Sequence, residues 1–194
     1  TKAQINLSQG LVAHYQFTGN ANDVSGNNNN GVVNGAVLCP GLSGLPNTAY
    51  LFDGISNYIQ VSNNSLLNSF PGDSFTLCAL MKTKGFYNGA CHGNCIIEKG
   101  NSDFIPGHYS LRFSDTYSSS FQNCNSPVNV NQQNYNLQVY GSSTTSSYQY
   151  PLPYIDTSQW DCIVASCDGD STRIYVNAQL RQSIAMTGSL LSNN

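Results

Sequence analysis

The residues best suited to hold a cation lie in a stretch rich in glycine and asparagine, GNANDVSGNNNNG, at positions 19–31. Asn20 and Asp23 carry oxygen atoms there, and Asp53 follows about thirty residues later in the tripeptide FDG. Ca²⁺ takes six to eight oxygen ligands, and glycine-rich backbone can turn carbonyl oxygens inward. Zn²⁺ would favour histidine or thiolate ligands, which this stretch lacks. The same residues equally suit Asx turns, whose side chains accept hydrogen bonds from backbone N–H groups.

Seven cysteines form a second group of reactive side chains. Their number favours an oxidising compartment, and it favours disulfides over buried reduced thiols. The odd count leaves at least one thiol free or paired between molecules. Cys162 and Cys167 lie about 16 Å apart along one predicted strand, so they cannot pair with each other unless that strand breaks. The pairing is left open for Cys39, Cys78, Cys95, Cys162 and Cys167.

The three histidines indicate neither a nucleophilic site nor a zinc site. Cys91 and His92 are adjacent, and adjacent side chains on a strand point to opposite faces. The pair Cys91-x3-Cys95 lacks the second ligand pair that a zinc site of standard spacing needs. His14 and His108 have no partner in the sequence pattern, so we interpret both as packed or surface histidines.

Composition limits the classes of partner. Charged residues make up 9% of the 194 residues, whereas about 25% is usual in soluble domains, and the net charge is -3. The seven Lys and Arg residues are scattered, which argues against nucleic-acid binding. No apolar run approaches the roughly 20 residues of a membrane helix, so we expect no membrane insertion. Together with the cysteines, this composition favours a secreted or cell-surface protein.

The elements that must position these residues are short strands. Alternating or apolar runs are broken by Gly, Asn, Pro and Ser, a pattern typical of one all-β domain, a sandwich or jelly roll. The residues 168–171, DGDS, predict a hairpin turn. The polar segments 118–136 and 142–153 are expected to be surface loops. Strands are expected at 11–17, 36–38, 49–52, 58–61, 75–81, 95–98, 109–113, 135–140, 160–167 and 173–176.

Three stretches carry a family resemblance. Residues 10–61 read GLVAHYQFTGNANDVSGNNNNG, VVNGAVL and AYLFDGISNYIQV, residues 73–82 read DSFTLCALMK, and residues 160–177 follow the pattern W-x2-IV-x3-DG-x4-IYVN. The chain thereby resembles laminin-G-like domains of the concanavalin A-like lectin/glucanase superfamily, especially those of secreted bacterial proteins. The resemblance covers most of the chain, and the first fifty residues are its most specific part. Asn177-Ala178 departs from the usual Asn-Gly of the family.

The resemblance implies one laminin-G-like domain over residues 1–194, folded as an antiparallel jelly-roll sandwich. It also implies a structural Ca²⁺ in the loop at 19–31. The ligands that carry over are Asn20, Asp23 and Asp53, together with a backbone carbonyl such as that of Gly19. Related secreted domains further imply a disulfide between Cys91 and Cys124.

Catalysis is not expected. Glucanases of the superfamily use two glutamates that flank an aspartate on one strand, and retaining hydrolysis needs two carboxyl groups about 5–5.5 Å apart. This chain has one glutamate, Glu98. Asp161 and Asp168 are separated by seven positions, and Asp170 shares a predicted turn with Asp168. We therefore predict that the protein is not an enzyme.

The resemblance implies a binding or adhesion module for carbohydrate, such as a glycan or cell-surface polysaccharide. Aromatic rings can stack on sugars, and amide and hydroxyl groups can bind sugar hydroxyls. The tyrosines could equally cap the sandwich, so no ligand-binding residue is assigned. The alternative function is a structural repeat or subunit of an extracellular filament or adhesin, with neighbouring copies as partners. The tyrosines in polar segments are Tyr87, Tyr117, Tyr148, Tyr150 and Tyr154.

The C-terminal residues suggest an incomplete sheet. Related domains continue past the IYVN hairpin with another strand or two, whereas residues 178–194 offer at most one short strand. We therefore expect either a longer natural protein or a strand supplied by a neighbouring subunit.

Overall fold

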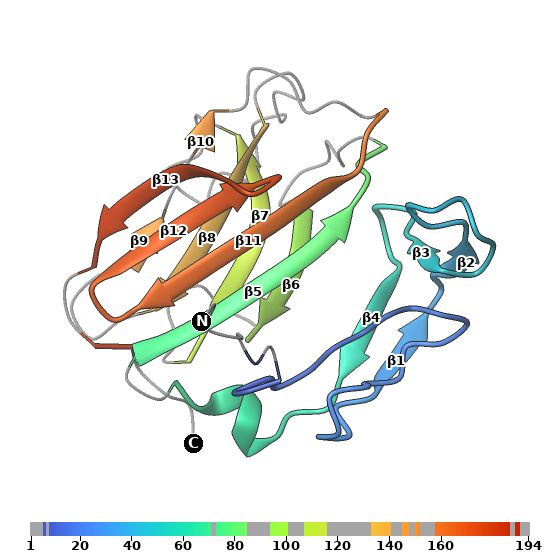
Figure 1. Ribbon diagram of the computed structural model, residues 1–194, viewed down its shortest axis with the longest axis horizontal. Coiled ribbons are helices and arrows are strands. Elements are labelled where there is room, and N and C mark those ends of the chain that lie inside the picture. The colour runs from blue at the N-terminus through green and yellow to red at the C-terminus, as the bar shows by residue number, and fades with distance from the viewer. Residues whose placement is uncertain are drawn as a thin grey trace, which may run out of the picture. The chain divides into compact units, whose positions relative to one another are not determined.

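The computed structural model describes most of the chain (Figure 1). The chain forms two compact units, Thr1–Leu67 and Asn68–Asn194, and each unit is described by itself. The prediction of one domain over residues 1–194 stays a prediction. The described residues are 6, 8–70, 73–84, 94–100, 107–115, 133–140, 145–147, 150–151, 158–186 and 189–190.

The first unit contains two small antiparallel sheets. Strand β1 (Gly31–Asn34) pairs with β4 (Tyr58–Val61), and β2 (Val37–Cys39) pairs with β3 (Ala49–Leu51). A short 3-10 helix, η1 (Ser65–Asn68), follows at the boundary between the units. Strand β1 was not predicted, because the Asn-Gly pairs on either side of it favoured turns.

The strand predicted at residues 11–17 is wrong. This segment forms only an isolated bridge, in which Tyr15 lies opposite Asp23, and Phe17 has a positive φ of 56°. The alternating pattern did not identify the partners of this segment. Side chains of the loop at 19–31, rather than a neighbouring strand, bind much of its backbone.

The second unit contains a four-stranded antiparallel sheet with the order β13-β12-β11-β5. Its pairing brings residues 74–81 beside residues 161–168, with Asp161 opposite Met81 and Asp168 opposite Ser74. Figure 1 shows β5 and β11 side by side along their length. The sheet is built from β5 (Ser74–Met81), β11 (Asp161–Asp168), β12 (Ser171–Val176) and β13 (Gln179–Ala185).

A five-stranded antiparallel sheet forms the other layer of this unit, with the order β10-β8-β7-β6 and with β9 also paired to β8. Strands β9 and β10 lie within the segment predicted as a surface loop at 142–153, and β8 begins within the loop predicted at 118–136. Both loop predictions are therefore wrong at these positions. The remainder of 118–136 lies outside the described residues. The strands are β6 (Asn94–Lys99), β7 (Tyr109–Asp115), β8 (Gln133–Tyr140), β9 (Thr145–Ser147) and β10 (Tyr150–Pro151).

The core of the second unit lies between its two sheets. Alternate residues of β11, including Ile163 and Ala165, are fully buried, as are Leu111 of β7 and Leu137 of β8. These residues belong to one apolar cluster, so the two sheets pack face to face. Full burial of a side chain of leucine size stabilises the fold by about 1.5–3 kcal/mol. The predicted all-β antiparallel sandwich is confirmed.

The other predicted strands match observed elements to within two residues at either end. Among the described residues, no helix is long and apolar enough to cross a membrane.

Candidate functional site

Asp23 lies at the centre of the loop that the sequence singled out. Its Oδ1 accepts hydrogen bonds from the backbone N–H groups of His14 and Ser25, each at 2.9 Å. Its Oδ2 accepts from the Ser25 hydroxyl at 2.8 Å and from the Asn29 backbone N–H at 2.9 Å. A backbone bond from Val24 N to the His14 carbonyl, at 2.9 Å, closes the same turn. The carboxylate therefore joins the loop to the segment that precedes it.

Asparagine side chains of the loop bind the same segment. The Nδ2 group of Asn27 donates to the carbonyl of Leu11 at 2.8 Å, and that of Asn29 donates to the carbonyl of Val12 at 2.8 Å. Asn29 is only 2% exposed, and its own carbonyl accepts from the Tyr15 hydroxyl at 2.6 Å. These bonds satisfy backbone groups that a strand partner would otherwise satisfy.

Asp53 organises a second turn of the first unit. Its Oδ1 accepts from the backbone N–H groups of Ile55, Ser56 and Asn57 at 2.9–3.0 Å. Its Oδ2 accepts from the Ser56 hydroxyl and the Asn57 amide, each at 3.1 Å. Every donor comes from the four residues after Asp53, so this turn is local.

Both carboxyl groups are strongly acidic. Partial burial raises the pKa of Asp23, but the bonds from His14, Ser25 and Asn29 outweigh it and lower that pKa to about 2. For Asp53, the bonds from the backbone of residues 55–57 lower the pKa to about 2. Both groups are therefore ionised at neutral pH.

These contacts determine how well the predicted calcium ligands fit a cation. A carboxylate has about four lone-pair positions, and protein donors fill them on both Asp23 and Asp53. The Asn20 Oδ1 accepts the Asn22 N–H at 2.9 Å. In the described conformation these oxygen atoms accept hydrogen bonds within the protein, so a Ca²⁺ ion would have to share them with these donors or displace the donors. In the part of the chain that the structure describes, no group of three or more His, Cys, Asp or Glu residues could hold a metal ion.

The arrangement observed is the Asx turn, the alternative that the residue chemistry left open. Asp23 and Asp53 each hold a separate turn through their own set of donors. Calcium binding through Asn20, Asp23, Asp53 and Gly19 is not tested by these contacts and stays a prediction.

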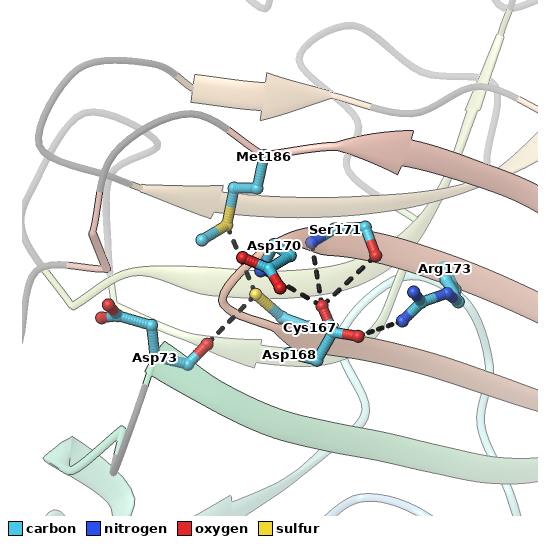
Figure 2. A network of polar contacts seen from close by, with 7 residues as sticks. All are labelled: Asp73, Cys167, Asp168, Asp170, Ser171, Arg173 and Met186. Carbon is cyan, nitrogen blue, oxygen red and sulfur yellow. Dashed lines mark hydrogen bonds and ion pairs between the residues drawn. The ribbon is translucent and has the colours of Figure 1, made fainter.

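Asp168 holds the predicted hairpin turn between β11 and β12 (Figure 2). Its Oδ1 accepts from the backbone N–H groups of Asp170 and Ser171, at 3.2 and 2.8 Å, and its Oδ2 forms an ion pair with Arg173. The bond from Arg173, followed by that from Ser171, lowers the pKa of Asp168 to about 2. A stably ionised carboxylate that is bound in this way serves as a turn brace and not as a general acid.

The other end of this network closes the sheet edge. The Cys167 Sγ contacts the Asp73 carbonyl at 3.3 Å and the Met186 Sδ at 3.4 Å, as Figure 2 shows. Asp73 Oδ1 also accepts the Leu190 N–H at 2.9 Å. The start of β5, the end of β11 and the residues after β13 are thereby joined.

Two further acidic residues of the described part, Glu98 and Asp161, have separate partners. Glu98 Oε2 lies 3.1 Å from the Cys95 Sγ, and Asp161 Oδ1 accepts from the Asn177 amide at 2.8 Å. Neither contact joins two carboxyl groups in the manner that glycoside hydrolysis needs.

One buried polar row was not singled out from the sequence. His108, Ser110 and Arg112 alternate along β7 with the core residues and are at most 2% exposed. His108 directly precedes β7 and is packed, one of the two positions expected for it. The available signal was the alternation HYSLRF, in which polar and apolar residues occupy opposite faces of one strand. The face of β7 away from the core is therefore polar and covered.

Several predicted residues lie outside the described part. They are Cys91, Cys124, His92, Tyr87, Tyr117, Tyr148 and Tyr154.

Comparison with protein families decides the class of the fold. Residues 53–194, more than half of the chain, match a laminin-G-type family described as the concanavalin A-like lectin/glucanases superfamily. The chain belongs to this superfamily. No curated protein and no solved structure matches it. The match begins at Asp53, so the stretch at 10–52, which carried the most specific part of the resemblance, lies outside it.

Membership of the superfamily bears on function as well as on fold. Laminin-G-like domains are generally non-catalytic binding modules and are often extracellular. The class of function indicated is therefore a binding module.

Proposed function

We propose that the protein is a secreted or cell-surface module that binds carbohydrate, such as a glycan or surface polysaccharide, and catalyses no reaction. The observation that carries this proposal is the match of residues 53–194 to a lectin superfamily. The antiparallel sandwich supports it, because such a scaffold presents loops at a rigid edge for binding.

Surface chemistry also supports a neutral, hydroxyl-rich ligand. Only 9% of the residues are charged, while 12 tyrosines offer aromatic faces. Sugar rings stack on such faces, and amides can bind their hydroxyl groups. Tyr150 lies on β10 at the edge of the five-stranded sheet, and the other tyrosines named above lie outside the described residues.

A glycan array with the full chain tests the proposal. We expect saturable binding to a defined set of glycans, and free glycan of the same structure should compete. Incubation with a bound glycan should release no new reducing ends, and the variant Glu98→Gln should behave like the wild type in both assays. Absence of saturable binding together with concentration-dependent self-association would instead support the alternative, a structural subunit of an extracellular filament.

A further inference from the structure

Two cysteines from distant parts of the sequence lie on adjacent strands of the four-stranded sheet. Cys78 of β5 lies opposite Val164, and Cys162 of β11 lies opposite Leu80. Cys78 and Cys162 are therefore diagonal neighbours on adjacent strands. Cys78 is two positions from Leu80, the residue opposite Cys162. Residues directly opposite each other share a face, and residues two apart on one strand share a face, so both cysteine side chains project from the same face of the sheet.

The two thiols are diagonal neighbours on that face of the sheet. The neighbouring Cys162 thiol is one of the groups that raise the pKa of Cys78, after burial. Cys78 is exposed and Cys162 is partly exposed, so small reagents can reach the pair. Their face is opposite to the core, because Ile163 and Ala165, which alternate with Cys162, are fully buried. Formation of a bond between the two sulfurs would therefore leave the core packing in place.

The other described cysteines have different surroundings. Cys167 is buried against Met186 and the Asp73 carbonyl. Cys95 lies beside the carboxylate of Glu98, and Cys39 belongs to the first unit. Among the described cysteines, Cys78 and Cys162 are placed by the strand register as neighbours on one face of a sheet.

We propose that Cys78 and Cys162 form a reversible disulfide that links β5 to β11. Loss of two protons and two electrons joins the two sulfurs, and a small-molecule disulfide accepts the electrons. One thiolate attacks that disulfide and releases one small thiol. The second protein thiolate then attacks the mixed disulfide and releases the second small thiol.

The position of the bond gives it a structural consequence. Among the described strands, β5 lies at the end of the sheet order and pairs with β11. A bond between the two strands would fasten that edge. It would also close the long loop of chain that carries β6 to β10, and cross-links that close long loops restrict the unfolded state most.

The pH dependence of oxidation follows from the same pair. Partial desolvation at the sheet surface, followed by the neighbouring Cys162, raises the pKa of Cys78. Only the thiolate attacks a disulfide, so bond formation should become faster as the pH rises.

The test is oxidation of the reduced full chain with excess glutathione disulfide, followed by alkylation and non-reducing peptide mapping. We expect one linked peptide that contains Cys78 and Cys162, faster formation at higher pH, and a higher melting temperature than that of the reduced protein. The variants Cys78→Ser and Cys162→Ser should each lose the linked peptide and the rise in melting temperature. The control Cys39→Ser should keep both.

Two outcomes would overturn the proposal. One is full alkylation of both cysteines after oxidation of the folded protein, with folding checked by circular dichroism. The other is a lasting glutathione adduct on Cys78 that Cys162 does not resolve.

Discussion

At the scale of single residues, the Asp23 carboxylate replaces a strand partner. It receives four hydrogen bonds from His14, Ser25 and Asn29, which fix the loop against the preceding segment. The change Asp23→Asn removes the negative charge. It also puts an NH₂ group, which cannot accept a hydrogen bond, where one carboxylate oxygen accepted bonds from the protein. We expect a loss of about 2 kcal/mol of unfolding free energy, or about 4–8 °C in the melting temperature of a chain of this size.

The acid dependence of stability tests the same contacts. The folded pKa of Asp23, about 2, lies below its ordinary value of 3.8. Its contribution is therefore complete above pH 3.8 and is lost as the pH falls towards 2. Urea unfolding between pH 5 and 2 should show a shallower decline for Asp23→Asn than for the wild type. The exposed control Asp170→Asn should keep the full decline, and equal slopes for all three proteins would contradict this assignment.

At the scale of elements, the hairpin between β12 and β13 contains avoidable strain. Asn177 and Ala178 both have positive φ, 52° and 65°, as a two-residue hairpin turn requires. Alanine is disfavoured there, whereas glycine adopts this conformation without a steric cost. We expect Ala178→Gly to raise the unfolding free energy by about 0.5–1 kcal/mol, measured by urea denaturation.

The neighbouring position provides the control for this prediction. The Asn177 side chain accepts the Cys162 N–H at 2.9 Å and donates to Asp161 at 2.8 Å. Asn177→Gly would lose both contacts and should destabilise the protein, although it also introduces a glycine at positive φ. Equal effects of the two substitutions would show that backbone strain does not determine stability at this turn.

The same elements show what a sequence can predict. Residues 58–61 alternate, residues 160–167 contain a short apolar run, and both lie beside turn residues, so the expected strands were close to those observed. Residues 11–17 alternate as well, but their partners are side chains of Asn27, Asn29 and Asp23. A local sequence pattern can indicate a strand, but it cannot indicate which groups form hydrogen bonds with that strand's backbone. The pairing of strands that are distant in the sequence, such as the register that brings Cys78 near Cys162, is likewise not contained in local pattern.

At the scale of the whole molecule, the question is whether stability depends on a cation. Protein donors make nine hydrogen bonds to the carboxylates of Asp23 and Asp53, so a cation would have to share these oxygen atoms with the donors or displace them. A ligand that binds only the folded state stabilises it by about 2.7 kcal/mol at a hundredfold excess over its Kd.

From the contacts, we expect equal melting temperatures of the full chain in excess Ca²⁺ and in excess chelator. The matched variant Asp53→Ala should melt at a lower temperature than the wild type in both conditions, because it loses the turn and not an ion. A melting temperature that rises with Ca²⁺ in the wild type, but not in Asp53→Ala, would show that the loop exchanges its internal donors for the cation and would establish the predicted calcium site.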